Sequence, residues 1–166
     1  MSLPESIRNA VEAALDPTGV SALADATPQG GGCINDTLRV RTSAGREAFL
    51  KWNPSAPPDF FHAEKRGLTA LRSTIDGSGI KGMRIPEVLA LGETEAGSWL
   101  LLEWVDSGSG APGFWKSLGS GLARVHGAPV PEGLREPNYI GPLPQDNAPA
   151  EGWPEIWVER RLIPQY

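Results

Sequence analysis

Residues 38–52 read LRVRTSAGREAFLKW, and this stretch decides the fold. Apolar Leu38 and Val40 alternate with arginines, turn residues follow at 42–45, and an extended pattern resumes at 48–52. Alternation with a period of two on both sides of a short polar turn is typical of an antiparallel β-hairpin. Because side chains two residues apart share a sheet face, Lys51 should point to the same side as Phe49.

The chain on either side of this hairpin adds both helices and strands. Before it, residues 3–15 carry an apolar residue at every fourth position, with Ser2 and Glu5 at capping-box spacing, and a weaker strand lies around 20–26. After it, a helix should follow Asp59, and strands are expected at 88–91 and 98–105 with a turn at 92–97. We therefore expect an α+β fold with about five antiparallel strands and one helix inserted after the third.

A second part of the chain begins near residue 106. A Ser/Gly-rich stretch at 106–113 precedes a predicted helix at 114–126, and a short helix carrying Trp153, Ile156 and Trp157 follows a segment rich in Pro and Gly. We place a lobe boundary at the Ser/Gly-rich stretch. The expected organisation is an N-lobe with its N-terminal helix over 1–105, then a linker and partial helical lobe over 106–166.

Composition narrows the class of protein. The 166 residues contain 15 Lys and Arg against 20 Asp and Glu, a net charge of −5, so the positive field of nucleic-acid and membrane-surface binders is missing. The longest apolar run, 99–102, is far shorter than the roughly 20 residues that cross a bilayer. A single cysteine, Cys33, excludes an internal disulfide, and the N-terminus shows no leader pattern. We expect a cytoplasmic protein that binds neither nucleic acid nor membrane.

Three glycines, Gly30, Gly31 and Gly32, precede Cys33 at the start of a predicted strand. The backbone N–H groups of such a run can approach a phosphate closely. The run matches neither the Walker pattern nor the Rossmann pattern, because both of these open a helix. Taken alone, it is more simply interpreted as a flexible hairpin turn.

Three further features follow the glycine run along the chain: a lysine on a strand, a glutamate on the next helix, and a segment after the last strand. Lys51 can reach phosphate oxygens beneath the loop, although an exposed lysine at a strand end is an equally open interpretation. Glu64 lies on the apolar stripe of the next helix, where a carboxylate is costly to bury unless a cation such as Lys51 pairs with it. Glu103, Trp104 and Val105 fit a hinge whose backbone bonds an adenine edge. Together these pieces match the nucleotide-holding part of a protein-kinase-like N-lobe.

The chain resembles the fructosamine (ketosamine) 3-kinase family, relatives of the aminoglycoside phosphotransferases. The resemblance covers nearly the whole chain and is carried by GGGCIN (30–35), FLKWN (49–53), FFHAE (60–64), LLEW (101–104), LARVH (122–126), NYIG (138–141), PQDN (144–147), Trp153 and ERRLIPQ (159–165). It implies that the phosphates are covered by Gly30, Gly31, Gly32, Cys33, Ile34 and Asn35. It also implies that Lys51 contacts the phosphates, that Glu64 holds Lys51, and that residues 103–105 hold the adenine.

The resemblance implies a reaction as well. ATP, with Mg²⁺, would phosphorylate the 3-hydroxyl of a ketosamine, a sugar joined through a ketoamine to an amine or a protein lysine, and the unstable product would break down in a deglycation repair. The partners would be a nucleotide and a glycated amine or protein. Two alternatives stay open: a related small-molecule kinase for aminoglycosides, choline or homoserine, and a noncatalytic nucleotide-binding or interaction module.

The catalytic segment of such a kinase is missing from the 166 residues. The family form is a His-Gly-Asp stretch with a later Asn and Asp, whereas His126 and Gly127 are followed by Ala128, and the only aspartate after Asp106 is Asp146. We expect no catalytic residue and no metal ligand in this chain, with the base and the Mg²⁺ ligands beyond Tyr166. The 166-residue chain should therefore bind nucleotide without transferring phosphate.

Two further features allow more than one interpretation. Cys33 is either an inert turn residue or a reactive thiol, open to oxidation or to joining a homodimer. The resemblance strengthens the second interpretation, because family members commonly carry a cysteine there, and both stay open. Arg160 and Arg161, with six tryptophans in the chain, suggest nucleic-acid binding. The acidic net charge and the i, i+4 spacing of Trp153 and Trp157 favour a packed helix face instead.

Overall fold

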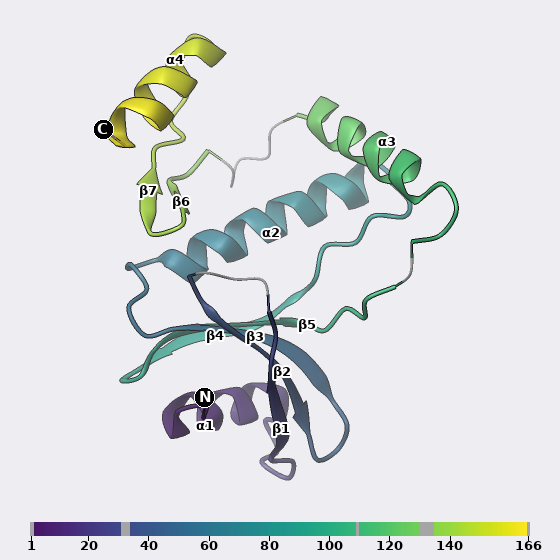
Figure 1. The fold of residues 1–166 in the computed structure, drawn as a ribbon, viewed down its shortest axis with the longest axis vertical. Helices are drawn as coiled ribbons and strands as arrows, with labels where there is room; N and C mark the ends of the chain where they lie inside the picture. Colours follow the sequence, from purple (N-terminus) through teal and green to yellow (C-terminus); the bar gives the residue numbers. More distant parts are fainter. Residues whose placement is uncertain (1, 31–33, 109, 130–134, 166) are drawn as a thin grey trace. The chain divides into compact units, whose positions relative to one another are not determined.

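The computed structural model describes residues 2–30, 34–108, 110–129 and 135–165 (Figure 1). The chain forms two compact units, the first over residues 1–61 and 86–107 and the second over 62–85 and 108–166. The long helix after the third strand thus falls almost wholly in the second unit. That the two units correspond to an N-lobe and a partial C-lobe stays a prediction.

The first unit contains a five-stranded antiparallel sheet, as expected. Its strands are β1 (Leu23–Pro28), β2 (Asp36–Thr42), β3 (Glu47–Asn53), β4 (Val88–Thr94) and β5 (Gly97–Glu103). The spatial order is β1-β2-β3-β5-β4, so β3 lies at the centre between β2 and β5. The predicted hairpin is confirmed with Leu38 opposite Leu50.

Strand β3 alternates between two environments. Ala48, Leu50 and Trp52 are buried in the core of the first unit, whereas Phe49 and Lys51 are half-buried. Period-two alternation sends these two sets to opposite faces of the sheet. The expectation that Lys51 shares a face with Phe49 is therefore confirmed.

Helix α1 (Glu5–Leu15) covers the face that carries Leu50 (Figure 1). Ile7, Val11 and Leu15 are at most 1% exposed and form the predicted apolar stripe. The predicted capping box is wrong: the N-cap is Pro4 and no side chain caps the helix. Proline suits a helix start because it has no N–H to leave unsatisfied.

Several strand boundaries differ from the sequence-based expectation. Strand β1 begins at Leu23 rather than near Val20, which is 84% exposed. The Asp16 carboxylate accepts hydrogen bonds from the backbone of Thr18 (3.0 Å) and of Ser21 (2.8 Å), which folds residues 16–21 into a turn. Strand β4 extends to Thr94 and β5 begins at Gly97, so the turn between them is shorter than predicted. Strand β5 ends at Glu103 rather than at Val105.

The second unit is built from helices and one small hairpin. It contains most of α2 (Phe60–Gly77), with α3 (Phe114–Gly127), β6 (Asn138–Ile140), β7 (Leu143–Gln145) and α4 (Trp153–Trp157), followed by a π-helical turn at Val158–Leu162 and a 3₁₀ turn at Ile163–Gln165. Arg124 of α3 donates to the carbonyl of Ser78, just after α2, at 2.8 Å. Among the described residues, none of the helices combines the length and apolar character needed to cross a membrane.

The turn after α1 should make stability depend on acid pH. Hydrogen bonds from Thr18 and then Ser21 lower the pKa of Asp16 from 3.8 to about 2. The stabilisation is complete above the unfolded-state pKa and is lost as pH falls through the folded-state pKa. We expect the melting-temperature advantage of the wild type over Asp16→Asn to be constant above pH 5 and to shrink between pH 4 and pH 2. Parallel melting curves throughout that range would contradict this role for Asp16.

Gly97 at the start of β5 should not tolerate a side chain. Its φ is +118°, and an added Cβ would lie 2.5 Å from the Cα of Pro54 and closer still to the carbonyl oxygen of Asn53. Gly45, at φ +82°, has open space around it. Gly97→Ala should cost about 3 kcal/mol, from left-handed strain plus overpacking, and Gly45→Ala about 1 kcal/mol from strain alone. Denaturant unfolding measures both, and equal losses would argue against the close approach.

Candidate functional site

Lys51 lies in the last part of β3, on the sheet face opposite α1. Its cross-strand neighbours are Thr37 on β2 and Leu100 on β5. One step along the same face, Phe49 lies between Arg39 and Leu102. This face of the sheet thus carries two adjacent rows of cross-strand neighbours, one centred on Lys51 and one centred on Phe49.

The connection from β1 to β2 is fastened at its base. The backbone of Gln29 donates to the Thr37 carbonyl, and the Thr37 hydroxyl donates to the Gln29 carbonyl, both at 2.8 Å. Gly30, Ile34 and Asn35 lie between these anchors, and Ile34 is 47% exposed. Gly31, Gly32 and Cys33 lie outside the described residues, so their phosphate-covering and redox roles stay predictions.

Asn53 ties the far side of this connection to the end of β3. Its side-chain amide donates to Oδ1 of Asn35 at 3.0 Å and to the Ile34 carbonyl at 3.3 Å, and its Oδ1 accepts from the backbone of Ser55 at 2.8 Å. Asn53 is 8% exposed, so these bonds satisfy a buried polar group. Residues 34–35 are thereby held to the strand two positions beyond Lys51. The sequence signal for this role is a short amide at the end of an apolar strand, the last residue of the FLKWN motif.

The predicted hinge follows β5 directly. The Glu103 carboxylate accepts from the backbone of Glu87 at 3.3 Å, so this side chain fastens the segment before β4. Trp104 donates from Nε1 to Oδ1 of Asp106 at 2.8 Å, and its ring centre lies 6.4 Å from that of Phe49. Val105 is 44% exposed. The side chains therefore order the 103–106 segment, and adenine binding by its backbone stays a prediction.

Glu64 lies on α2 and is half-buried. It belongs to the second unit, whereas Lys51 belongs to the first. The Lys51–Glu64 ion pair therefore stays a prediction.

The residues at this strand end meet part of what ATP and Mg²⁺ require. Lys51 supplies a cation, and the anchored 34–35 backbone lies beside the same strand end, so these residues fit a phosphate group. Within the described ranges, no group of three His, Cys, Asp or Glu side chains lies so as to hold a metal ion. That the protein ligands for Mg²⁺ lie beyond Tyr166 stays a prediction.

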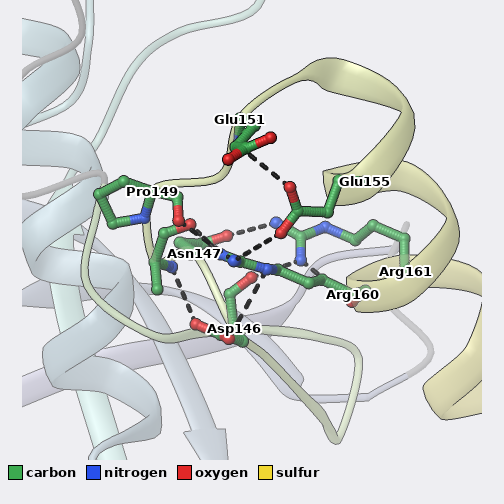
Figure 2. A network of polar contacts seen from close by, with 8 residues as sticks. Asp146, Asn147, Pro149, Glu151, Glu155, Arg160 and Arg161 are labelled. Atoms are coloured by element: carbon green, nitrogen blue, oxygen red, sulfur yellow. Dashed lines mark hydrogen bonds and ion pairs between the residues drawn. The ribbon is translucent and has the colours of Figure 1, made fainter.

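Two of the motifs noted in the sequence meet in the second unit. Figure 2 shows Arg160 and Arg161 reaching the loop after β7. Arg160 donates to the carbonyls of Ala148 and Pro149, the latter at 3.1 Å, and lies 3.5 Å from the Glu155 carboxylate. Arg161 donates to the Asp146 carbonyl at 2.7 Å and to the Asn147 side chain. Hydrogen bonds thus join the PQDN segment to the ERR segment, and both guanidinium groups take part in these contacts.

The fructosamine kinase family model matches residues 7–166. A protein of Enterococcus faecium named a probable ketoamine kinase is 36% identical over 139 residues, which cover 83% of this chain and 46% of the relative. The chloroplastic protein-ribulosamine 3-kinase of Oryza sativa is 32% identical over 149 residues, covering 87% of this chain and 40% of the relative. The chain thus spans about half the length of the curated relatives it matches.

Solved structures agree with the sequence comparison. A fructosamine-3-kinase candidate from Thermobifida fusca superposes with a TM-score of 0.69 at 27% identity, covering 98% of this chain and 53% of that one. A second candidate, from Haemophilus somnus, gives a TM-score of 0.75 at 21% identity and covers 95% of this chain and 51% of the other, which supports the fold. The α+β kinase-like fold is confirmed, and the chain belongs to the fructosamine kinase family.

Proposed function

We propose that this chain is the ATP-holding half of a ketosamine kinase, an enzyme that transfers the γ-phosphate of ATP to the 3-hydroxyl of a sugar linked as a ketoamine. The observation that supports this most is the strand end at which Asn53 fastens residues 34–35 beside the strand of Lys51. A positive side chain next to anchored backbone is the arrangement that binds phosphate oxygens. The family match supports a ketosamine as the substrate class.

In this proposal the chain's own residues bind and orient the nucleotide. Lys51, held by Glu64, neutralises phosphate charge, and Gly30, Gly31, Gly32, Cys33, Ile34 and Asn35 cover the phosphates. Residues 103–105 hold the adenine. Magnesium, held by residues outside this chain, would supply further neutralisation of the transferred group, because phosphoryl transfer depends mainly on positioning and charge stabilisation. The acceptor would be a glycated amine or protein lysine, and the role would be deglycation repair in the cytoplasm.

Nucleotide binding should depend on both features of the strand end. We expect the 166-residue chain to bind ATP, and Lys51→Met to weaken binding about tenfold or more, since it removes a charge-assisted contact. Asn53→Ala should weaken binding about threefold and lower stability by about 1 kcal/mol, because buried hydrogen bonds to residues 34–35 are lost. Calorimetric titration and thermal unfolding measure the two effects.

A matched control separates the site from general charge effects. Lys81 is an exposed lysine in the loop after α2, and Lys81→Met should leave ATP affinity within twofold of the wild type. Equal losses in Lys51→Met and Lys81→Met, or no ATP binding by the wild type, would contradict the proposed phosphate site.

Phosphoryl transfer itself should require residues beyond those in the chain. The purified 166-residue chain should show no ADP release above background with ATP, Mg²⁺ and fructose-lysine. Fusion to the second half of the Enterococcus faecium relative should restore acceptor-dependent turnover, with fructose-lysine preferred over choline, homoserine or an aminoglycoside. Turnover by the 166 residues alone would show that the missing base is not required, and a different acceptor preference would favour the related small-molecule kinases.

A further inference from the structure

An arginine, a glutamate and a tryptophan form a contact cluster on the Lys51 face of the sheet. Arg39 on β2 contacts both carboxylate oxygens of Glu47 on β3, at 2.7 and 2.8 Å. The Arg39 guanidinium carbon lies 4.5 Å from the ring centre of Trp104, a cation–π arrangement. All three residues belong to the first unit. We call this cluster the tryptophan clamp.

The clamp holds the indole by several groups. The guanidinium lies over the ring, the Phe49 ring is tilted 32° to it, and Asp106 accepts the Nε1 hydrogen bond at 2.8 Å. The Glu47 side chain, which is 25% exposed, in turn holds the Arg39 guanidinium in place. An indole held this way restricts the backbone of the residue that carries it. The clamp therefore orders the segment from Glu103 to Val105.

The tryptophan clamp lies beside the Lys51 row on the same face of the sheet. Arg39, Phe49 and Leu102 form the row next to that of Thr37, Lys51 and Leu100 on the same face. Rows two residues apart are separated by about 6.6 Å. A nucleotide whose phosphates lie at the Lys51 row would extend its base along this face towards the clamp. Pairing with Glu47 neutralises the Arg39 charge, which suits an uncharged ring rather than a further phosphate.

We infer that Arg39 and Glu47 are positioning residues for the purine base, because they hold Trp104 and so fix the backbone of residues 103–105. This inference rests on the proposed nucleotide site and adds the residues that select the base. Removal of the guanidinium should therefore weaken recognition of the base and leave recognition of the phosphates intact.

The test compares ATP with inorganic tripolyphosphate, which has the phosphates but no base. Arg39→Met keeps most of the apolar stem, and we expect it to weaken ATP binding about fivefold to tenfold and tripolyphosphate binding less than twofold. Glu47→Gln should act in the same direction and more weakly, and Arg39→Lys should restore part of the affinity for ATP. The matched control is Arg41→Met, because Arg41 lies one row further along the same strand face and opposite Glu47. It should change neither affinity.

A second readout reports on the clamp without any ligand. In protein labelled with 5-fluorotryptophan, the ¹⁹F signal assigned to Trp104 through Trp104→Phe should shift in Arg39→Met and stay in place in Arg41→Met. An unchanged signal would overturn the clamp. A shifted signal with equal losses of ATP and tripolyphosphate affinity would overturn base selection. If the wild type bound neither ligand, the nucleotide site and base selection would both fail, while the ¹⁹F shift alone would still decide whether the clamp exists.

Discussion

The burial of Ala48, Leu50 and Trp52 beneath α1 is the interaction on which the first unit depends. The three side chains occupy one face of the central strand and are at most 8% exposed. A fully buried Leu, Val or Ile side chain is worth about 1.5–3 kcal/mol, so the packing of α1 onto this face favours a single register. A slip of one residue would turn Lys51 into the apolar core, where an unpaired charge is very costly. The position of Lys51 on the opposite face therefore follows from packing on the α1 side.

Periodicity predicts those parts of the fold that depend on neighbours in the sequence. The 38–52 pattern predicted the hairpin and the face of Lys51, and the i, i+4 apolar spacing predicted α1, because each signal lies within one element. The capping box does not form because Pro4 is the N-cap, and β1 begins later than the apolar pattern predicts because hydrogen bonds to Asp16 fold the preceding residues into a turn. Local hydrogen bonds by Asp, Thr and Ser compete with regular structure, and a hydrophobic pattern does not report them.

Interactions between distant residues could not be predicted from one sequence. The contact of Arg39 with Trp104 joins residues 65 positions apart, and it requires the β3–β5 register before the two side chains can be placed on one face. Asn53 binds residues 34–35 only because the hairpin folds back on itself. In the second unit, Arg160 and Arg161 are paired basic residues by sequence, yet they bond loop carbonyls and side chains at 146–149. Trp153 and Trp157 were expected to form a packed helix face, but they remain 68% and 49% exposed and stack on each other, with ring centres 5.6 Å apart.

The charges on the Lys51 face suit the proposed nucleotide, which has charged phosphates at one end and an uncharged base at the other. Hydrogen bonding to Glu47 raises the pKa of Arg39, so the guanidinium stays ionised and the pair is neutral overall. Lys51 lies four residues from Glu47 along β3, about 13 Å at the rise of an extended strand. An arginine without a carboxylate partner near Trp104 would also attract phosphate to that end of the face. In the proposed site, Glu47 balances the charge of Arg39 while the guanidinium still contacts the Trp104 ring, which requires a glutamate and an arginine on adjacent strands rather than an apolar pair.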